Sequence, residues 1–315
     1  MNIDEPGQMS GLDLAERYFE RHGRPMLHQR FSAYAGRVAA GLIGDGSDCL
    51  GFDDEYSRDH DWGPGFCLWL TAADYQAIGD QLAAEYRRLP ARFEGFRRDT
   101  SDWGEGRVGV FEIGAFYRSF IGRPSAPTTS LEWLRIPEKN LAACTAGRIF
   151  DDPLGEFSDI QGRLRGFYPD DVRLAKIAAR CMSAGQSGQY NFLRSVRRGE
   201  PFAAQYAATK FCADAMSLVY LLNHRYAPYY KWLRRGLAGQ PRLGDFMVAM
   251  VEALVVADTP TAKHGVVEAI CQAIIGELRA EGLSAASSTF LVDHGPAVHA
   301  GITCPTLRQI NVWAG

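Results

Sequence analysis

The sequence lacks any long uninterrupted apolar run. Its longest apolar stretch, residues 246–257, contains Glu252 and is too short to cross a bilayer. The first six residues are acidic and have no apolar core, so we expect no signal peptide. We therefore expect a cytoplasmic protein that has no membrane partner.

Paired cysteines are also missing. The chain has 7 cysteines in 315 residues, and no two of them have the Cys-x-x-Cys spacing of a zinc knuckle. Their odd number and wide separation indicate reduced thiols in a bacterial-type cytoplasm.

The chain has no excess of charge of either sign. It carries 34 Lys plus Arg against 37 Asp plus Glu, a net charge of −3 at pH 7. This balance gives no general attraction to nucleic acid or to an anionic membrane, so we do not expect nucleic acid as a partner. A polyanion would have to be met by a local basic patch. Hydrophobic residues make up 46 % of the chain, as in ordinary globular proteins, and 315 residues suffice for two domains.

Two common nucleotide-binding motifs are absent. No Gly-Lys-Ser or Gly-Lys-Thr occurs, which excludes a P-loop. A dinucleotide-binding turn would need a third glycine where Cys49 stands. His294, His299 and Cys304 do not share one face of a helix, so we expect no metal there.

A turn of small residues, Gly44-Asp45-Gly46-Ser47, follows an apolar run. Such a turn lets backbone N–H groups approach an anion closely. Asp59-His60-Asp61 begins twelve residues after Ser47. On an extended strand, Asp59 and Asp61 would face the same side and share one or two hard cations, while His60 would point to the other face. The pattern predicts a phosphate cradle beside a platform for divalent metal.

The aspartate pair has other interpretations. An aspartate pair on a strand also occurs at the solvated edge of a sheet, but the Gly46-Ser47 turn upstream favours metal binding. An EF-hand calcium loop is excluded, because Leu70 stands where the bidentate Glu is required. Residues 62–65, Trp-Gly-Pro-Gly, follow Asp61 directly, and Pro and Gly weaken a strand. They indicate an edge position or a bulge that re-aims Asp61.

The residues from Gly46 to Pro64 resemble the signature of the polymerase-beta-type nucleotidyltransferase superfamily: Gly-Ser, a spacer, then Asp-x-Asp. The sequence Asp-His-Asp-Trp-Gly-Pro, residues 59–64, resembles the corresponding motif of a bacterial branch of this superfamily that is known mostly as a domain of unknown function. The similarity extends over most of the chain, through residues 131–134, 150–155, 167–169 and 226–232.

The resemblance implies an enzyme that moves an NMP from an NTP to a hydroxyl acceptor and releases pyrophosphate. ATP is the expected nucleotide, and the acceptor is a small molecule or a protein. Asp59 and Asp61 would hold Mg²⁺ or Mn²⁺, and Gly46 and Ser47 would hold the β- and γ-phosphates. The alternative is a catalytically silent nucleotide-binding or regulatory protein of the same fold.

Completing such a site requires a third carboxylate or a general base. Glu112 is the first candidate, because it lies on a predicted strand. Glu132 and Asp152 are its rivals, each beside a short apolar run.

Cations are needed to neutralise a triphosphate. Arg58 adjoins the aspartates, although strand alternation points it away from them. Arg225 and Lys231 flank an aromatic and proline-containing turn in the second half of the chain. The competing interpretation of this turn is the start of an amphipathic helix whose cations lie in water.

The expected fold class is α/β (α+β). Residues 1–160 would form a small mixed-sheet nucleotidyltransferase domain, residues 161–285 an α-helical domain that binds substrate or nucleotide, and residues 286–315 a tail. The active site would lie in the cleft between the domains. Helices are predicted over residues 12–22, 71–89, 243–255 and 263–280, and strands over 66–70, 108–113 and 148–150. Residues 31–42 follow helical spacing, but 39–43 fit a first strand as well.

Overall fold

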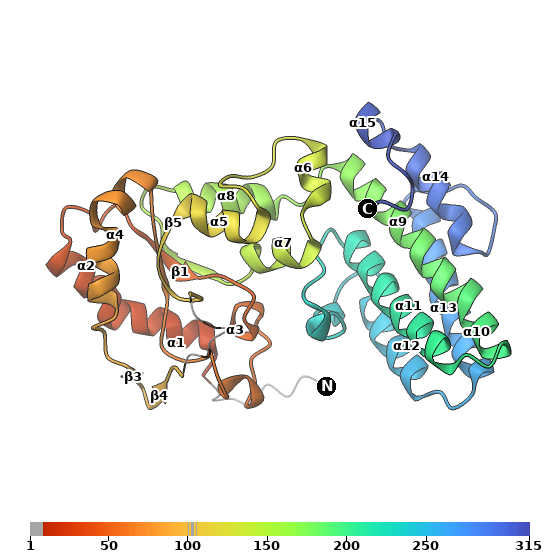
Figure 1. The fold of residues 1–315 in the computed structure, drawn as a ribbon, viewed down its shortest axis with the longest axis horizontal. Coiled ribbons are helices and arrows are strands. Elements are labelled where there is room, and N and C mark those ends of the chain that lie inside the picture. The colour runs from red at the N-terminus through yellow and green to blue at the C-terminus, as the bar shows by residue number, and fades with distance from the viewer. Residues whose placement is uncertain (1–8, 100, 102–103, 105) are drawn as a thin grey trace. The chain divides into compact units, whose positions relative to one another are not determined.

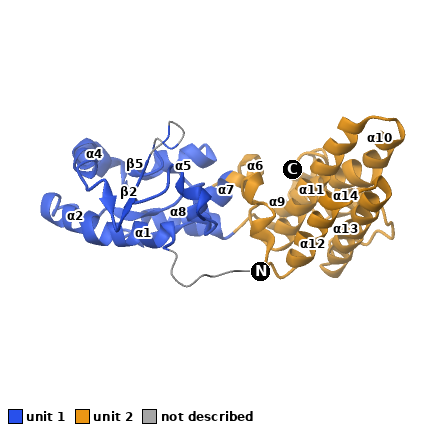
Figure 2. Ribbon diagram, turned by 90° about the horizontal axis from the view of Figure 1, so that it is seen from below, with its two compact units in different colours: residues 1–126, 140–166 blue, residues 127–139, 167–315 orange. Residues whose placement is uncertain are grey.

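The computed structural model describes residues 9–315 except 100, 102–103 and 105. The chain forms two compact units (Figure 2). Unit 1 comprises residues 1–126 and 140–166, and unit 2 comprises residues 127–139 and 167–315. Unit 1 holds a small mixed sheet and unit 2 is helical in its described residues, which confirms the predicted fold class.

Unit 1 contains both helices and strands (Figure 1). They are α1 (Gly11–Tyr18), the π-helix η1 (Phe19–Gly23), α2 (Arg24–Arg30), β1 (Ala39–Leu42), α3 (Ser47–Leu50), the 3-10 turn η2 (Tyr56–Arg58), β2 (Cys67–Leu70), α4 (Ala72–Tyr86), β3 (Arg92–Phe93), β4 (Phe96–Arg97), β5 (Gly109–Glu112), α5 (Ile113–Ile121), β6 (Arg148–Asp151) and α8 (Glu156–Arg165). Helix α7 (Glu138–Thr145) begins in unit 2 and continues in unit 1.

The main sheet has the strand order β5-β2-β1-β6. Strand β1 runs antiparallel to β2 and β6, and β2 runs parallel to β5. In this register Gly41 lies opposite Cys67, and Cys67 lies opposite Gly109. The end of β1 and the starts of β2 and β5 therefore share one edge of the sheet, where the site lies.

Side chains cover both faces of this sheet. Leu68 and Leu70 pack with residues of α1, α2 and α4 in one core cluster. The alternate residue Trp69 stacks on Phe157 of α8, with ring centroids 3.9 Å apart, and packs against Phe116 of α5. Because both faces are buried, β2 is apolar throughout rather than alternating, as strands covered on both sides are.

Most predicted elements of unit 1 are confirmed, and one is wrong. The strands expected near residues 66–70, 108–113 and 148–150 are β2, β5 and β6, and Thr71 caps α4 by accepting a hydrogen bond from the backbone N–H of Asp74. Residues 31–42 do not form the helix that their spacing favours. The chain turns after Arg30 and enters β1 at Ala39, which confirms the alternative interpretation.

Unit 2 contains α6 (Ser130–Arg135), α9 (Asp170–Gly185), the π-helix η3 (Gln186–Phe192), α10 (Leu193–Arg197), α11 (Pro201–Leu222), η4 (Tyr230–Trp232), η5 (Arg235–Leu237), α12 (Gly244–Val256), α13 (Pro260–Ala280), η6 (Leu291–Asp293), α14 (His294–Ala300) and α15 (Pro305–Arg308). Helices α12 and α13 confirm the two predicted there. The predicted tail is folded: α14 and α15 pack against α9 and belong to unit 2.

Two general features complete the fold. In the described part of the chain no helix has the length and apolarity needed to cross a membrane. The seven cysteines carry free thiols, and Cys304 alone among them is half-exposed.

Candidate functional site

The turn from Gly44 to Ser47 joins β1 to the single-turn helix α3. Gly46 is the N-cap of α3, and Ser47 is its first residue. The first backbone N–H groups of a helix have no acceptor inside the helix. The turn therefore presents backbone donors and the half-buried Ser47 at the sheet edge.

Arg107 links this turn to the loop that carries Asp61. Its Nη2 donates to Oδ1 of Asp48 over 2.8 Å, and its Nη1 donates to the backbone carbonyl of Asp61 over 2.9 Å. The link also explains Gly46, because a Cβ at this position would lie 1.7 Å from Nη2 of Arg107. Only glycine leaves room for the Arg107–Asp48 pair against the turn.

The carboxylate of Asp48 helps to keep Arg107 positively charged. Burial acts to lower the pKa of Arg107, but the neighbouring acidic groups Asp48, Cys49 and Asp45 and the hydrogen bond to Asp48 together outweigh it, and the pKa lies above its ordinary value. Nearby, burial and then the charge of Arg107 lower the pKa of Arg98. Arg98 also donates to the Asp61 carbonyl, over 3.3 Å, so two guanidinium groups meet at this carbonyl.

Asp59 and Asp61 lie in a loop, so their predicted placement on a strand is wrong. Asp61 has a left-handed backbone with φ 56°, and Gly63 has φ 126°. Pro64 has no N–H to donate to a strand partner. Strand pairing begins only at Cys67, after the Trp-Gly-Pro-Gly segment. Residues 62–65, which were expected to mark an edge position or a bulge, therefore separate Asp59 and Asp61 from the strand.

Ser101 fixes the carboxylate of Asp61. Its backbone N–H donates to Oδ1 over 2.9 Å, and its hydroxyl donates to Oδ2 over 2.6 Å. Burial acts to raise the pKa of Asp61, but these hydrogen bonds and the charges of His60 and Arg107 outweigh it, and the pKa lies below its ordinary value. Asp61 is therefore an anion at neutral pH.

Asp59 is open to solvent. Its side chain is 68 % exposed, and Oδ1 lies 3.0 Å from Nδ1 of His60. His60 is exposed too, so it pairs with Asp59 at the surface and is not packed in the core.

The donor chemistry of this loop fits Mg²⁺. Mg²⁺ takes oxygen ligands and is usually held by one or two carboxylates, while water and substrate phosphates fill the other positions. Asp59 and Asp61 supply two carboxylates on one loop. Within the described residues there is no group of three or more His, Cys, Asp or Glu side chains that could hold a metal ion. Water and substrate phosphates would therefore have to complete the coordination.

Arg58 does not extend toward the aspartates. Its guanidinium lies over the rings of Trp62 and Phe96, at 4.6 Å and 5.4 Å from their centroids, and donates to the backbone carbonyl of Met9. These contacts favour a structural role in the loop over the predicted phosphate contact.

Glu112 is the last residue of β5, which confirms its predicted strand. Its two carboxylate oxygens accept hydrogen bonds from the backbone N–H groups of Gly114 and Ala115, so it caps α5. In the register Glu112 pairs with Leu70, three residues and about 10 Å beyond the edge at Cys67. Both its contacts and its distance argue against a role beside Asp59 and Asp61.

A cavity of about 350 Å³ runs along β5 beside the turn. Gly44, Asp45 and Arg107 line it together with Glu112 and several aromatic side chains: Tyr75, Phe111, Phe116 and Phe120. Its volume suits part of a small ligand.

The remaining predicted residues lie elsewhere. Glu132, in unit 2, forms a capping box with Thr129 at the start of α6. Asp152, in unit 1, accepts a hydrogen bond from the backbone N–H of Ser158. Arg225 and Lys231 are exposed in unit 2, and Nζ of Lys231 lies 5.0 Å from the ring centroid of Trp232. A single site formed by both units stays a prediction.

Sequence reasoning missed Asp48, Ser101 and Arg107. Asp48 directly follows Gly46-Ser47 and is buried, which no local pattern indicates. Arg107 precedes a correctly predicted strand, but its partner lies 59 positions away in the sequence.

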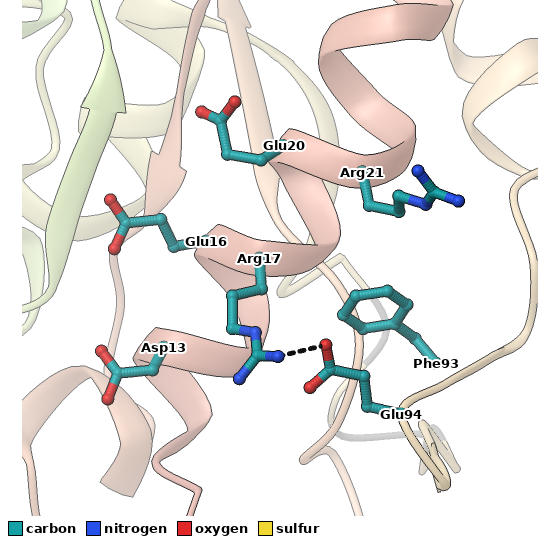
Figure 3. Close-up of a pocket in the computed structure, with 7 residues that line it drawn as sticks. All are labelled: Asp13, Glu16, Arg17, Glu20, Arg21, Phe93 and Glu94. Atoms are coloured by element: carbon teal, nitrogen blue, oxygen red, sulfur yellow. Dashed lines mark ion pairs between the residues drawn. The ribbon is translucent and has the colours of Figure 1, made fainter.

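The hollow on the surface of α1, about 740 Å³ in volume, is lined mostly by charged side chains (Figure 3). Each of its carboxylates is paired with an arginine: Asp13 and Glu16 with Arg148, Glu20 with Arg24, and Glu94 with Arg17. Because these charges are already compensated, we assign the hollow no ligand.

Comparisons with known proteins cover the two units unequally. A family model described as a domain of unknown function (DUF4037) matches residues 133–233, less than half of the chain. This match agrees with the resemblance to a domain of unknown function over residues 150–155, 167–169 and 226–232, but it contains none of the Gly46 to Asp61 motif and does not test the nucleotidyltransferase resemblance. No curated protein matches the chain.

One solved structure matches, that of a nucleotidyltransferase-like protein from Exiguobacterium sibiricum 255-15. The TM-score is 0.37 at 13 % identity, over 83 % of this chain and 76 % of that chain. A TM-score this low carries no argument about function, so any proposal depends on the residues of this chain.

Proposed function

We propose that unit 1 is a metal-dependent nucleotidyltransferase, which moves an NMP from an NTP to a hydroxyl acceptor and releases pyrophosphate. The observation that carries this proposal is the Arg107 link, which holds the Gly46-Ser47 turn and the loop of Asp59 and Asp61 together at one sheet edge. Transfer of a nucleotidyl group needs phosphate donors and carboxylates side by side.

Each residue would have a distinct role. The backbone donors of the turn and the Ser47 hydroxyl would bind the β- and γ-phosphates. Asp59 and Asp61 would hold Mg²⁺ or Mn²⁺, which when bound neutralises phosphate charge at the attacking and leaving oxygens. Ser101 and Arg107 would position Asp61. The acceptor oxygen would attack the α-phosphorus, the bond to the β-phosphate oxygen would break, and the acceptor proton would pass to solvent or a base.

A second candidate is a protein that binds the nucleotide without transferring it. Two observations favour it: Glu112 is engaged in capping α5, and Glu132 is engaged in capping α6. Neither carboxylate is therefore available as an uncommitted general base. Metal-dependent release of pyrophosphate distinguishes the two candidates.

Nucleotide and metal together are expected to raise the melting temperature. Ligand present at about a hundred times its Kd adds about 2.7 kcal/mol of stability if it binds only the folded state. Thermal melts with ATP, GTP, CTP and UTP, each with Mg²⁺ and with EDTA, measure this. We expect ATP to give the largest shift and EDTA to remove it. Melts that no nucleotide shifts under any metal condition would exclude both candidate functions.

Substitution of Lys231 by Met tests whether unit 2 contributes to the nucleotide site. If Lys231 contacts the phosphates equally in the ground and transition states, the variant raises the nucleotide KM and spares kcat. Lys263→Met, on α13, is the control in the same unit. If Lys231 lies in water, the activation free energy of the variant should stay within about 0.5 kcal/mol of that of the parent. That result would show that the aromatic turn is not part of the nucleotide site.

A further inference from the structure

A cavity in unit 2, about 540 Å³ in volume, lies where the π-helix η3 faces α11. Its lining includes Gln186 and Asn191 from η3, Phe202, Tyr206 and Lys210 from α11, and Trp313. This volume falls in the range of small-molecule sites, and no residue proposed for the nucleotide site lines it.

The wall that η3 supplies is built by close packing. The π-helix interrupts a helical run from Asp170 to Arg197, and such wide turns occur frequently at functional sites. A Cβ at Gly188 would lie 2.4 Å from the ring of Phe211, and a Cβ at Gly185 would lie 2.7 Å from the backbone N of Val292. The two glycines, Gly185 at the end of α9 and Gly188 within η3, thus let this segment approach its neighbours closely.

Aromatic rings on the opposite wall are unusually open to solvent. Phe202 is 82 % exposed, Tyr206 is 62 % exposed, and Trp313 is 48 % exposed. The rings of Phe202 and Tyr206 lie nearly parallel, with an interplanar angle of 24° and centroids 6.4 Å apart. Large apolar rings gathered around one cavity offer flat faces on which another ring can stack.

The polar groups of the cavity are uncharged or compensated. Among the residues that the structure describes, the side-chain amides of Gln186 and Asn191 have no hydrogen-bond partner. Each amide presents donors and an acceptor. The ammonium of Lys210 is neutralised by Asp214, whose Oδ2 lies 2.6 Å away. The cavity therefore complements a neutral ligand whose edge carries both donors and acceptors.

We propose that this cavity binds a neutral, planar heteroaromatic molecule of the nucleobase or pterin type. Its ring stacks on Tyr206, beside the nearly parallel ring of Phe202, and its amide-like edge pairs with Gln186 and Asn191. The site is separate from the proposed nucleotidyl transfer, because it requires neither metal nor phosphate.

The test uses the full chain in EDTA, which keeps metal-dependent binding in unit 1 silent. The probes are guanosine and pterin, which share one hydrogen-bonding edge, and 2-naphthylmethanol, a ring without that edge. Affinities come from ligand-observed NMR titration, with quenching of tryptophan fluorescence in the parent and in Trp313→Phe as a local readout. Circular dichroism checks the folding of each variant.

Tyr206→Ala is expected to weaken binding of the preferred probe about tenfold, because stacking is lost. Gln186→Leu combined with Asn191→Leu is expected to weaken guanosine or pterin about tenfold and to spare 2-naphthylmethanol. Tyr56→Ala, an exposed tyrosine of unit 1, is the matched control and is expected to bind as the parent does.

Binding of guanosine alone, of pterin alone or of both supports the site and identifies the source of the ring. The proposal is overturned if neither probe binds, or if Tyr206→Ala binds as tightly as the parent. It is also overturned if the double Leu variant keeps full affinity for guanosine and pterin. Loss of binding in Asp61→Asn would place the ligand in unit 1 and would overturn it as well.

Discussion

Asp59→Asn and Asp61→Asn are each expected to abolish metal-dependent nucleotidyl transfer while leaving a folded protein. The loss of one metal-binding charge should remove several kcal/mol of transition-state stabilisation, which is on the order of 10³-fold or more in rate. Asp59 is exposed and Asp61 lies in a loop, so neither substitution disturbs the core. Pyrophosphate release with each NTP, with and without Mg²⁺, measures the effect.

Asp99→Asn is the matched control for these two variants. Its side chain is 69 % exposed, nearly the same as that of Asp59 at 68 %, and pairs with Arg97. Asp99 contacts Asp61 through its backbone carbonyl, which accepts from the Asp61 N–H over 2.8 Å and which the substitution keeps. We expect this control to retain parental rates. If both site variants also retained parental rates and normal circular dichroism spectra, Asp59 and Asp61 would not be metal ligands.

Arg107→Met is expected to destabilise unit 1 strongly. The Asp48 side chain is 3 % exposed, and Arg107 is its counter-ion at 2.8 Å. Removing one partner of a buried ion pair leaves an uncompensated charge, which costs about 3 to 5 kcal/mol. Denaturation in urea, followed by circular dichroism, measures the loss. Arg107→Lys keeps the charge but cannot reach two acceptors with one planar group, so an intermediate loss is expected.

Asp48→Asn combined with Arg107→Met separates the ion pair from simple packing. Because the double variant removes both charges of this ion pair and leaves neither partner unpaired, it should be more stable than Arg107→Met alone. The two residues are not coupled if the loss of stability in the double variant equals the sum of the losses in the two single variants. The account of how the Gly46-Ser47 turn is held to the Asp61 loop would then be wrong.

The sheet was predictable because its signals are local. The apolar runs at residues 66–70 and 108–113 are continuous, as buried strands are, and Thr71 stands three residues before Asp74 at a helix start. The helical spacing of residues 31–42 misled because tertiary pairing of β1 with β2 and β6 outweighs a local pattern. The capping role of Glu132 could have been read from Thr129-x-x-Glu132, which is a capping-box signature.

The candidate site was predictable in its motif but not in its geometry. Gly46, Ser47, Asp59 and Asp61 are visible as a pattern, yet the pattern does not show that Gly63 and Pro64 move the aspartates into a loop. The contacts that fix this loop come from Ser101 and Arg107, which are 40 and 46 positions from Asp61 in the sequence. Such long-range pairs follow from the fold and leave no local trace.

The metal and the triphosphate can be located directly in crystals grown with Mn²⁺ and a non-hydrolysable ATP analogue. Anomalous scattering identifies Mn²⁺ independently of the surrounding atoms. The account predicts Mn²⁺ in contact with the carboxylates of Asp59 and Asp61, and the β- and γ-phosphates against Gly46 and Ser47. Mn²⁺ bound away from both aspartates, or a triphosphate bound away from the Gly46-Ser47 turn, would contradict it.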